Sequence, residues 1–356
     1  MIDRPPHVAI VGCTGAVGRE FLNILAERDL PMASLTLLAS PRSAGRVIEH
    51  DGSPIEVKAL AESSFDGVDI ALFSAGGEIS RQFAPFAVES GATVIDNSSA
   101  FRMDPGVPLI VPEINGDVLD EFRGRGPGII ANPNCSTIIA LMAIAPLHRA
   151  APCGIQRMVI STYQAASGGG AAMMAELEQQ ARDHAAGRPL RHDILGRPYL
   201  FNLFSHNTAI DPATGYNTEE LKLIRETHKI LDDATIAITA TCVRVPVLRA
   251  HSEAINLTFR EPGTMSEAQA RQVLAAATGI RIVDDRAANR FPEPIDASGR
   301  DEVLVGRIRA DASQPPGKGL SLFVAGDQLR KGAALNAIQI AEWLMARDRR
   351  SAVSHR

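Results

Sequence analysis

The stretch from His7 to Gly18 reads HVAIVGCTGAVG and joins a short apolar run to a turn that contains three glycines. The run from His7 to Val11 is rich in β-branched residues, which predicts a buried strand. Gly12, Gly15 and Gly18 follow at once, and the apolar residues after them recur at helical spacing. A strand, a glycine turn and a helix in this order predict the start of a parallel, doubly wound sheet.

The next hundred residues continue this alternation of strands and helices, as in a parallel sheet covered on both faces. The expected elements lie at Leu35 to Ala39, Ile70 to Ser74, Glu78 to Glu89 and Thr93 to Asp96. We therefore predict an α/β fold whose first domain, residues 1–132, is a Rossmann-type dinucleotide-binding domain. The final apolar helix, roughly Ala333 to Met345, contains the only tryptophan, Trp343. We expect residues from about 328 to 350 to return to the first domain.

Beyond Asn132 the strands become longer and more alternating, which predicts an α+β domain of residues 133–327 with a mixed, largely antiparallel sheet. The expected strands are Arg157 to Tyr163, Thr235 to Val247, Ser252 to Phe259, Val303 to Arg309 and Leu320 to Ala325. The expected helices are Ala171 to Ala186, Thr218 to Leu231 and Ser266 to Ala276. Asn217 and Glu220 are suited to cap the second of these helices. Residues 187–216 lack periodicity and could form a functional lobe or a subunit contact.

Composition limits the possible partners. The 356 residues carry a formal net charge of −5 and no run of lysine and arginine that would follow a phosphate backbone, so nucleic acid is not an expected partner. No stretch approaches the roughly 20 apolar residues of a membrane span. The four cysteines form no CxxC pair, so we expect neither a metal site nor a disulfide framework, and a reducing cytoplasm fits this pattern.

The glycine turn is suited to a dinucleotide, because backbone N–H groups at a helix start attract a pyrophosphate. The candidate cofactor contacts in this turn are Gly12, Thr14, Gly15, Ala16 and Val17. A plain strand-to-helix turn is the alternative. The second strand ends in ASPRS, where Arg42 and Ser43 could hold a 2′-phosphate and no carboxylate repels it, so NADP is favoured over NAD. Otherwise Arg42 would be an ordinary solvated arginine.

Cys135 lies in NPNCST, directly ahead of the apolar helical run IIALMAIAPL. A helix N-terminus favours the thiolate form of a cysteine, and thiolate attack on an activated carbonyl gives a thioester. The alternative is a small buried hydrophobic residue, which is what we expect of Cys13, Cys153 and Cys242.

Six ordered segments, GCTGAVG, SSAFRM, NPNCST, STYQAASGGG, EELK and CVRVPVLRAHSE, resemble those of the aspartate-semialdehyde dehydrogenase family. The resemblance covers nearly the whole chain. It implies a cytoplasmic, NADP-dependent homodimer whose second domain is catalytic and mediates dimerisation. The implied reaction is the reversible conversion of L-aspartyl 4-phosphate to L-aspartate 4-semialdehyde through a cysteine thioester. The implied pathways make lysine, threonine, methionine and diaminopimelate.

The same resemblance assigns the catalytic roles and part of the substrate site. It makes Cys135 the nucleophile and His251 the acid/base catalyst, a task suited to a group that titrates near neutral pH. Gln164 positions the substrate, and Asn134 helps to orient the acyl group. Arg244 binds the substrate α-carboxylate through its planar fork of donors, with a buried structural ion pair as the alternative.

The phosphate and cofactor contacts carry over in the same way. Arg102 and Lys222 correspond to the phosphate-binding residues, and Glu219 would hold the substrate amine, although EELK leaves open whether Glu219 or Glu220 does so. An ordinary surface ion pair is the alternative for Glu219 and Lys222. Three further positions are implied as cofactor contacts, namely Ser167, Gly168 and Gln328. Family members often have asparagine at the last of these.

Two other functions compete with this interpretation. N-acetyl-glutamyl-phosphate reductase performs the same chemistry on a longer substrate, but its cysteine motif usually has glycine before the cysteine, where this chain has Asn134. A catalytically silent homologue that acts as a scaffold or binding partner is disfavoured by the joint presence of Cys135, Gln164, Arg244 and His251.

Overall fold

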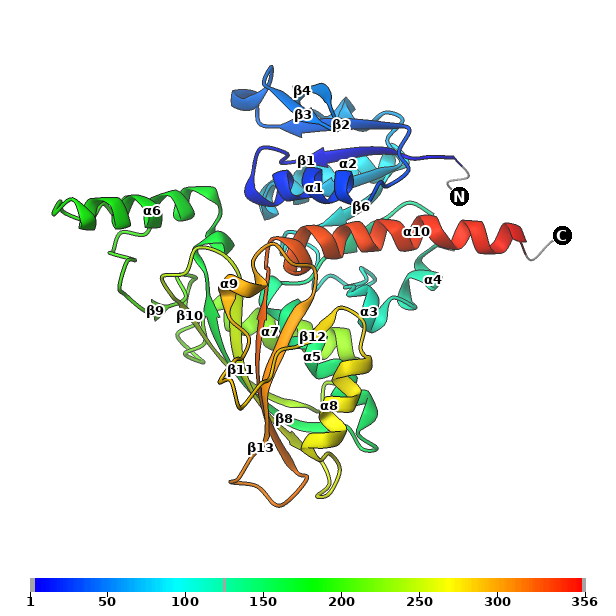
Figure 1. The fold of residues 1–356 in the computed structure, drawn as a ribbon. Helices are drawn as coiled ribbons and strands as arrows, with labels where there is room; N and C mark the ends of the chain where they lie inside the picture. Colours follow the sequence, from blue (N-terminus) through cyan, green and yellow to red (C-terminus); the bar gives the residue numbers. More distant parts are fainter. Residues whose placement is uncertain (1–3, 124–125, 354–356) are drawn as a thin grey trace. The chain divides into compact units, whose positions relative to one another are not determined.

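The computed structural model of this chain describes residues 4–123 and 126–353. The chain divides into two compact units, residues 1–134 with 333–356 and residues 135–332 (Figure 1). Within the described residues, none of the helices combines the length and the apolar character that a membrane crossing requires.

The first unit is built on a seven-stranded sheet with the order β3-β4-β2-β1-β5-β6-β7. The strands are β1 His7–Val11, β2 Ser34–Ala39, β3 Val47–His50, β4 Ser53–Ala59, β5 Ile70–Phe73, β6 Thr93–Asp96 and β7 Ile129–Ala131. Neighbouring strands pair in parallel except β3 and β4, which form an antiparallel edge hairpin. This hairpin is not evident from the sequence, because its strands are short and largely exposed. The predicted Rossmann-type fold is confirmed.

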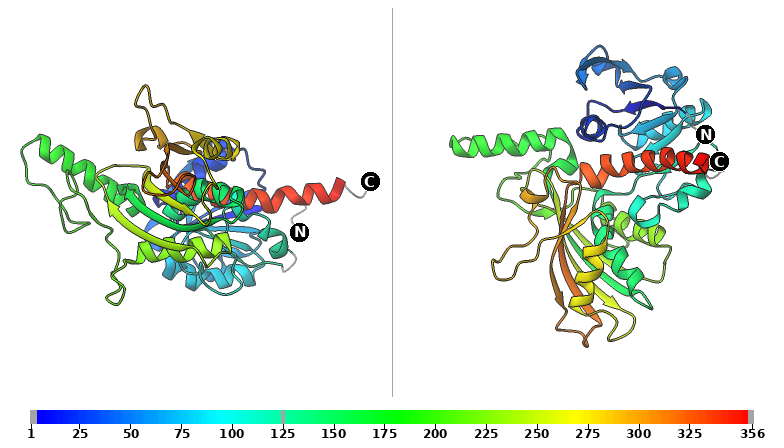
Figure 2. Two further views of the ribbon diagram at one scale, coloured as in Figure 1. Left: turned by 90° about the horizontal axis from the view of Figure 1, so that it is seen from below. Right: turned by 45° about the vertical axis from the view of Figure 1, so that its right-hand side comes forward.

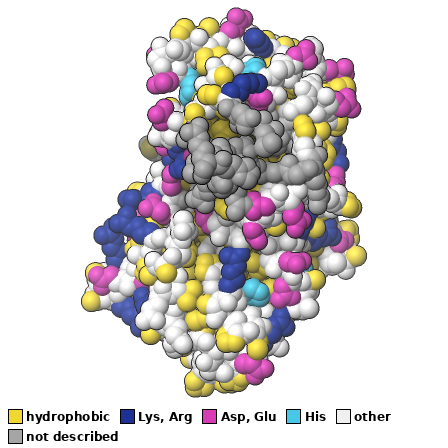
Figure 3. Space-filling view, turned by 90° about the vertical axis from the view of Figure 1, so that its right-hand side faces the viewer, with side chains coloured by type: hydrophobic (Ala, Val, Ile, Leu, Met, Phe, Trp, Pro, Cys, Tyr) yellow, Lys and Arg dark blue, Asp and Glu magenta, His cyan; other side chains and the backbone are white. Residues whose placement is uncertain are grey.

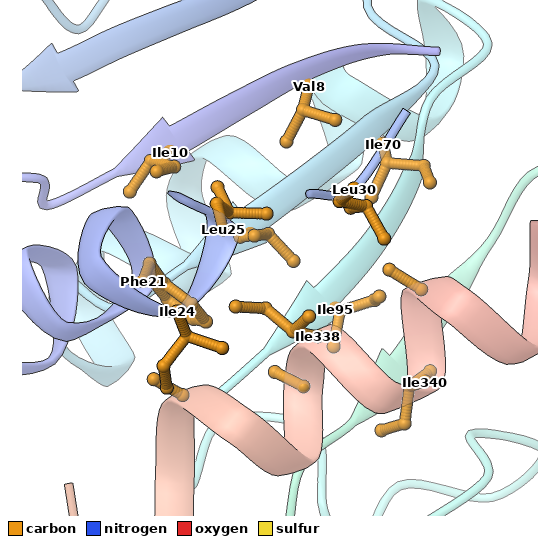
Figure 4. Packing of buried hydrophobic residues seen from close by; sticks show 14 of the residues in the cluster. Val8, Ile10, Phe21, Ile24, Leu25, Leu30, Ile70, Ile95, Ile338 and Ile340 are labelled. Atoms are coloured by element: carbon orange, nitrogen blue, oxygen red, sulfur yellow. The ribbon is translucent and has the colours of Figure 1, made fainter. Parts of the chain in front are cut away.

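Helices cover both faces of this sheet. They are α1 Ala16–Glu27, α2 Gly77–Glu89, α3 Pro112–Asn115, α4 Val118–Arg123 and α10 Leu335–Val353. Side chains alternate along β1, so Val8 and Ile10 pack in one core with Phe21 of α1 and Ile338 of α10 (Figure 4). Ala9 and Val11, which point to the opposite face, pack in a second core with residues of α2. Helix α10 begins two residues later than expected, after a π-helical turn, Arg330–Ala334.

The second unit contains a sheet with the order β12-β13-β14-β11-β8-β10-β9. Its strands are β8 Ile155–Gln164, β9 Phe204–Ser205, β10 Ala237–Arg244, β11 His251–Phe259, β12 Ile280–Ile282, β13 Val303–Ala310 and β14 Gly319–Gly326. Two of the six pairings, β8 with β10 and β12 with β13, are parallel and the rest are antiparallel, which confirms the predicted mixed sheet. Strand β10 is shorter than expected, because it ends at Arg244 before Pro246.

The helices of this unit are α5 Cys135–Ala150, α6 Ala171–Ala185, α7 Thr218–Leu231, α8 Glu267–Ala276 and α9 Pro294–Ala297. Asn217 and Glu220 form the predicted capping box at the start of α7, with Asn217 Oδ1 accepting from the Glu220 N–H at 2.9 Å. Both views of Figure 2 show α6 extending away from the sheet of its own unit. On the face drawn in Figure 3, basic and acidic side chains are interspersed with hydrophobic ones.

One face of the second sheet is buried and the other is only partly covered. Along β8, Gln164, Thr162 and Ile160 are buried, whereas Tyr163 and Val159 on the opposite face are half-buried. Helices α5 and α7 contact the buried face. Because the covering helices exclude water, polar side chains on this face are held in a dry environment.

Candidate functional site

The glycine turn of the first unit packs tightly against neighbouring backbone, which requires glycine at two positions. Gly12 has a φ of +89°, and a Cβ there would lie 2.4 Å from the Ser74 carbonyl oxygen. A Cβ on Gly18 would lie 2.2 Å from the Gly12 carbonyl oxygen, so both positions exclude a side chain. Gly15 is the N-cap of α1, and no side chain caps the helix. The first N–H groups of α1 are thus suited to a pyrophosphate.

The end of β2 is followed by a positively charged side chain, Arg42, as the sequence predicts. Arg42 lies exposed in a 3₁₀ turn, Pro41–Ser43, directly after the strand, and Ser43 is buried beneath it. A ribose 2′-phosphate would meet a guanidinium and a hydroxyl at this position and no carboxylate, which fits NADP.

Arg102 is buried in the first unit and held by backbone oxygens. Its Nε donates to the Asn132 carbonyl at 2.8 Å, and one terminal nitrogen donates to the Asn97 carbonyl at 2.8 Å. The Asn132 side chain itself donates to Asn97 Oδ1 at 2.8 Å. These contacts fix the guanidinium close to the end of β6 and to Asn132, the first residue of the NPNCST motif.

Cys135 is the first residue of α5 and is half-buried. A Cβ on Gly332 would lie 3.0 Å from the Cys135 Cβ, so a glycine permits the chain to pass directly beside the thiol. The helix start stabilises negative charge, which favours the thiolate. The position therefore agrees with a nucleophile and not with a sealed apolar residue.

The other three cysteines differ from Cys135. Cys13 and Cys242 are buried as expected, and burial raises the pKa of the Cys13 thiol to about 11. Burial likewise raises the pKa of Cys242. The expectation for Cys153 was wrong, because this residue is exposed in the turn that follows α5. Its apolar character did not reveal that the helix ends just before it.

Strand register brings three predicted site residues into one row. Arg244 of β10 is paired with Gln164 of β8. On the other side of β8, Ser252 of β11 is paired with Tyr163, so His251 and Gln164 are the next residues along these antiparallel strands. Arg244, Gln164 and His251 thus lie side by side across three strands, on the buried face.

His251 is fully buried, and its ring orientation is fixed by the backbone. The Ala165 N–H donates to Nδ1 at 3.0 Å, so the neutral ring carries its proton on Nε2. Within the described residues, Nε2 has no hydrogen-bond partner. Burial, and then the positive charge of Arg244, lower the pKa of His251 well below its usual range. The neutral ring can therefore offer one N–H to an oxygen that develops negative charge.

Gly168 lies against both functional side chains. It belongs to the 3₁₀ turn Ala166–Gly169 that follows β8. A Cβ on Gly168 would lie 2.9 Å from Nε2 of His251 and 3.0 Å from a terminal nitrogen of Arg244. His251 and Arg244 therefore meet at this turn, and only glycine leaves the space between them open. Ser167, beside it, is buried.

Arg244 is 4% exposed, yet its contacts are neutral. Its Nε donates to Asn207 Oδ1 at 3.2 Å, and a terminal nitrogen donates to the Ala165 carbonyl at 2.9 Å. Across the described parts of the chain, no carboxylate forms an ion pair with it. The alternative of a buried structural ion pair is thus excluded for those parts. A buried guanidinium without an anion is suited to bind an anionic ligand.

Helix α7 supplies a carboxylate to the same row. Glu219 accepts from Gln164 Nε2 at 3.2 Å through one oxygen and pairs with Lys222 Nζ at 3.1 Å through the other. Glu219 is 5% exposed, so this is not an ordinary surface pair. Glu220 instead accepts from the backbone N–H groups of Asn217 and Cys242. Glu219 is therefore the glutamate that faces the candidate site, and Glu220 is structural.

Gln328 lies beside these residues, with its amide nitrogen directed at Ser167 Oγ and its amide oxygen at the backbone of Ala250. It is 2% exposed. Both ends of the amide therefore have a protein partner within this unit.

Two buried titratable side chains, His206 and Glu253, are not evident from the sequence. His206 is 6% exposed, and burial followed by the charge of Arg244 lowers its pKa to about 4. Glu253, two residues after His251, is fully buried, and neither carboxyl oxygen has a hydrogen-bond partner among the described residues. Burial raises the pKa of Glu253 well above its usual range. Only the pairing of β11 and the placement of residues 187–216 reveal these positions.

Comparison with known proteins identifies the family. A family model described as "Semialdehyde dehydrogenase, NAD binding domain" matches residues 7–122, and one described as "Semialdehyde dehydrogenase, dimerisation domain" matches residues 144–331. The chain is 52% identical over 346 residues to an aspartate-semialdehyde dehydrogenase of Synechocystis sp., covering 97% of this chain and 99% of that protein. It is 48% identical over 341 residues to the enzyme of Aquifex aeolicus, covering 95% and 98%.

A solved structure gives the same result. The chain aligns with aspartate semialdehyde dehydrogenase II of Vibrio cholerae complexed with ASA at a TM-score of 0.90 and 42% identity, covering 97% of this chain and 99% of that one. The resemblance found in the sequence motifs is confirmed, and this chain belongs to the aspartate-semialdehyde dehydrogenase family.

Proposed function

We propose that this chain catalyses the NADPH-dependent conversion of L-aspartyl 4-phosphate to L-aspartate 4-semialdehyde and phosphate, and the reverse reaction. The observation that carries the proposal is the row of Arg244, Gln164 and His251, in which a buried guanidinium without a carboxylate partner in the described chain lies beside a neutral imidazole. This arrangement suits a substrate that has a free carboxylate at one end and a reacting carbonyl nearby.

The reaction begins at Cys135. Its thiolate attacks the acyl carbon, a C–S bond forms, and the C–O bond to phosphate breaks as phosphate leaves with the electron pair. The carbon of the resulting thioester then accepts the hydride that bound NADPH would supply. The tetrahedral oxyanion then collapses, releasing the aldehyde and regenerating the thiolate. The Nε2–H of His251 stabilises negative charge on that oxygen, because a fixed donor in a dry site needs no reorganisation.

The remaining candidate residues hold the two ends of the substrate. Arg244 binds the α-carboxylate, and Glu219 binds the ammonium group while Gln164 orients Glu219 from the sheet. Two cations, Arg102 and Lys222, bind the phosphate. Asn134, which is buried directly before Cys135, orients the acyl group.

The cofactor site is proposed in the glycine turn of the first unit, at Gly12, Thr14, Gly15, Ala16 and Val17. The start of α1, which no side chain caps, supports a pyrophosphate there. Arg42 and Ser43 support NADP over NAD. Ser167, Gly168 and Gln328 remain proposed cofactor contacts from the second unit.

We also propose that the protein is a cytoplasmic homodimer. The second unit matches a domain described as a dimerisation domain. Segment 187–216 of that unit exposes four large apolar side chains, which a partner subunit would remove from water. They are Ile194, Phe201, Leu203 and Ile210. The four cysteines are free thiols, the state that a reducing cytoplasm maintains.

The test is phosphate-dependent reduction of NADP by L-aspartate 4-semialdehyde. The wild-type protein should be active, and Cys135→Ala should lose several orders of magnitude in kcat because the covalent route disappears. Cys153→Ala, which removes an exposed thiol, is the matched control and should retain activity. N-acetylglutamyl phosphate should be a poor substrate in the reverse assay. Full turnover by Cys135→Ala, or none by the wild type, would contradict the proposal.

A further inference from the structure

The residue before His251 has a strained backbone. Ala250 has a φ of +72°, in the left-handed region that residues with a Cβ adopt only at an energetic cost. It is fully buried and lies at the entry to β11, so its conformation sets the direction in which His251 leaves the turn. A strained residue at this point needs contacts that hold it.

Gln328 supplies one of these contacts. The Ala250 N–H donates to Gln328 Oε1 at 2.9 Å, and the Gln328 amide nitrogen donates to Ser167 Oγ. The neighbouring residue acts in the same sense, because Arg249 Nε donates to Asp327 Oδ2 at 2.6 Å. The segment after β14 therefore holds both residues that precede His251.

The turn after β8 holds the same segment from the other side. The Ala166 N–H donates to the Val247 carbonyl at 2.8 Å, and the Ser167 N–H donates to the Leu248 carbonyl at 3.0 Å. Gln328 bonds to Ser167 as well as to Ala250, so it ties the two sides together.

This arrangement determines which way the His251 ring points. Its Nδ1 accepts from the Ala165 N–H at 3.0 Å, one residue before the turn that carries Ser167. Since a backbone N–H can only donate, the proton of the neutral ring must sit on Nε2, which lies next to the open space at Gly168. A shift of Ala250 would move His251 Nδ1 away from the Ala165 N–H, and the ring proton would no longer be restricted to Nε2.

We propose that Gln328 is a positioning residue for His251. By holding Ala250 in the left-handed conformation, Gln328 preserves the hydrogen bond from the Ala165 N–H to His251 Nδ1, and the Nε2–H stays directed into the site. This role in turnover rests on the proposed function. It differs from the cofactor contact implied by the family, because it acts through the backbone of Ala250 and does not require NADP to be bound.

The primary variant is Gln328→Met, which keeps the side-chain volume and removes the amide. We expect kcat, measured at saturating NADPH, to fall about 10- to 100-fold, the range for a slightly misplaced catalytic group, which a lost NADPH contact alone would not produce. Gln328→Leu, which also removes the amide, should behave similarly and serves if the first variant folds poorly. Asn256→Ala is the control, since it removes an amide from β11, the strand that carries His251, at a position away from the site.

Ala250→Gly provides the rescue. Glycine adopts the left-handed conformation without the cost that a Cβ imposes, so the double variant Gln328→Met with Ala250→Gly should recover at least about fivefold of the lost kcat. Ala250→Gly alone should remain within about twofold of the wild type, because the native conformation is already the one that glycine accepts.

A readout without turnover separates this proposal from the proposed function. The imidazole ¹⁵N spectrum of His251, assigned with His251→Gln, should show the Nε2–H tautomer in the wild type and a mixture in Gln328→Met. An unchanged tautomer together with unchanged kcat would overturn the positioning role. So would a loss explained entirely by weaker NADPH binding, or a double variant no better than the single one. A wild-type protein that has the expected tautomer but no activity would instead refute the proposed function.

Discussion

Nε2 of Gln164 donates a hydrogen bond to Oε1 of Glu219 at 3.2 Å, joining strand β8 to helix α7 across 55 positions of sequence. The other carboxylate oxygen of Glu219 pairs with Lys222. A neutral amide and a cation thus orient one buried carboxylate from two directions. In the proposed function this carboxylate would meet the substrate ammonium group without having to be ordered when the substrate binds, which would reduce the entropic cost of binding.

Glu219 and Glu220 should respond differently to the same substitution. Glu219→Gln removes a charge that faces the site, so we expect the KM for aspartate semialdehyde to rise about 10- to 100-fold, as for loss of a charge-assisted bond. Glu220→Gln instead leaves one oxygen to accept from the two backbone N–H groups of Asn217 and Cys242, so it should lower the free energy of unfolding by about 1 kcal/mol with little change in KM. Steady-state kinetics and urea unfolding of both variants check this. Equal effects of the two substitutions on KM would contradict the assignment.

Gly168→Ala should impair catalysis without unfolding the protein. The new Cβ would lie 2.9 Å from Nε2 of His251 and 3.0 Å from the Arg244 guanidinium, so one of these side chains must move. We expect kcat/KM to fall about 100-fold, since small displacements of catalytic groups have effects of this size. Gly77→Ala is a suitable control, because no atom lies within 4 Å of its Cβ position. Unchanged kinetics in Gly168→Ala would show that the site is looser than the structure indicates.

His206 should make the protein sensitive to acid. It faces Arg244 of β10 and both Glu219 and Lys222 of α7, and its pKa is lowered from 6.5 to about 4, first by burial and then by Arg244. Above pH 6.5 the ring is neutral in both states. Between pH 6.5 and pH 4 the unfolded chain binds a proton that the folded chain does not. The free energy of unfolding therefore falls by about 3 kcal/mol as the pH is lowered through this range.

The matching variant is His206→Gln, which cannot titrate. Urea unfolding between pH 4.5 and 7.5 should show a shallower loss of stability for the variant than for the wild type. Some acid sensitivity should remain in the variant, because the pKa of His251 is lowered in the same direction. Identical slopes for the two proteins would mean that His206 accepts a proton in the folded state.

Glu253 should act in the opposite direction. Burial raises the pKa of its carboxyl well above the ordinary value of 4.5, so the folded protein retains a proton that the unfolded chain releases. The stability contributed by the protonated state is full below pH 4.5 and is lost as pH rises through the folded pKa. Glu253→Gln removes this titration. Measured at pH 5, 7 and 9, the variant should gain stability relative to the wild type as pH rises, and parallel curves would contradict this.

Much of the architecture follows from local patterns that the sequence displays. The apolar run before the glycine turn predicts β1, and the capping pair Asn217 and Glu220 predicts the start of α7, because both depend on residues that are neighbours along the chain. The position of Cys135 at a helix start follows in the same way. The edge hairpin of β3 and β4 did not, since short exposed strands have no strong periodicity.

Pairings between distant segments were decided only by the folded chain. Strand register placed Arg244, Gln164 and His251 in one row, and α7 selected Glu219 over Glu220 as the glutamate that faces them. Residue order does not encode which strand lies beside which, because that depends on how all the helices and strands bury their apolar faces together. The sequence therefore predicted which residue types form the candidate site. Tertiary packing determined which of these side chains are charged, which are neutral and which are held in place.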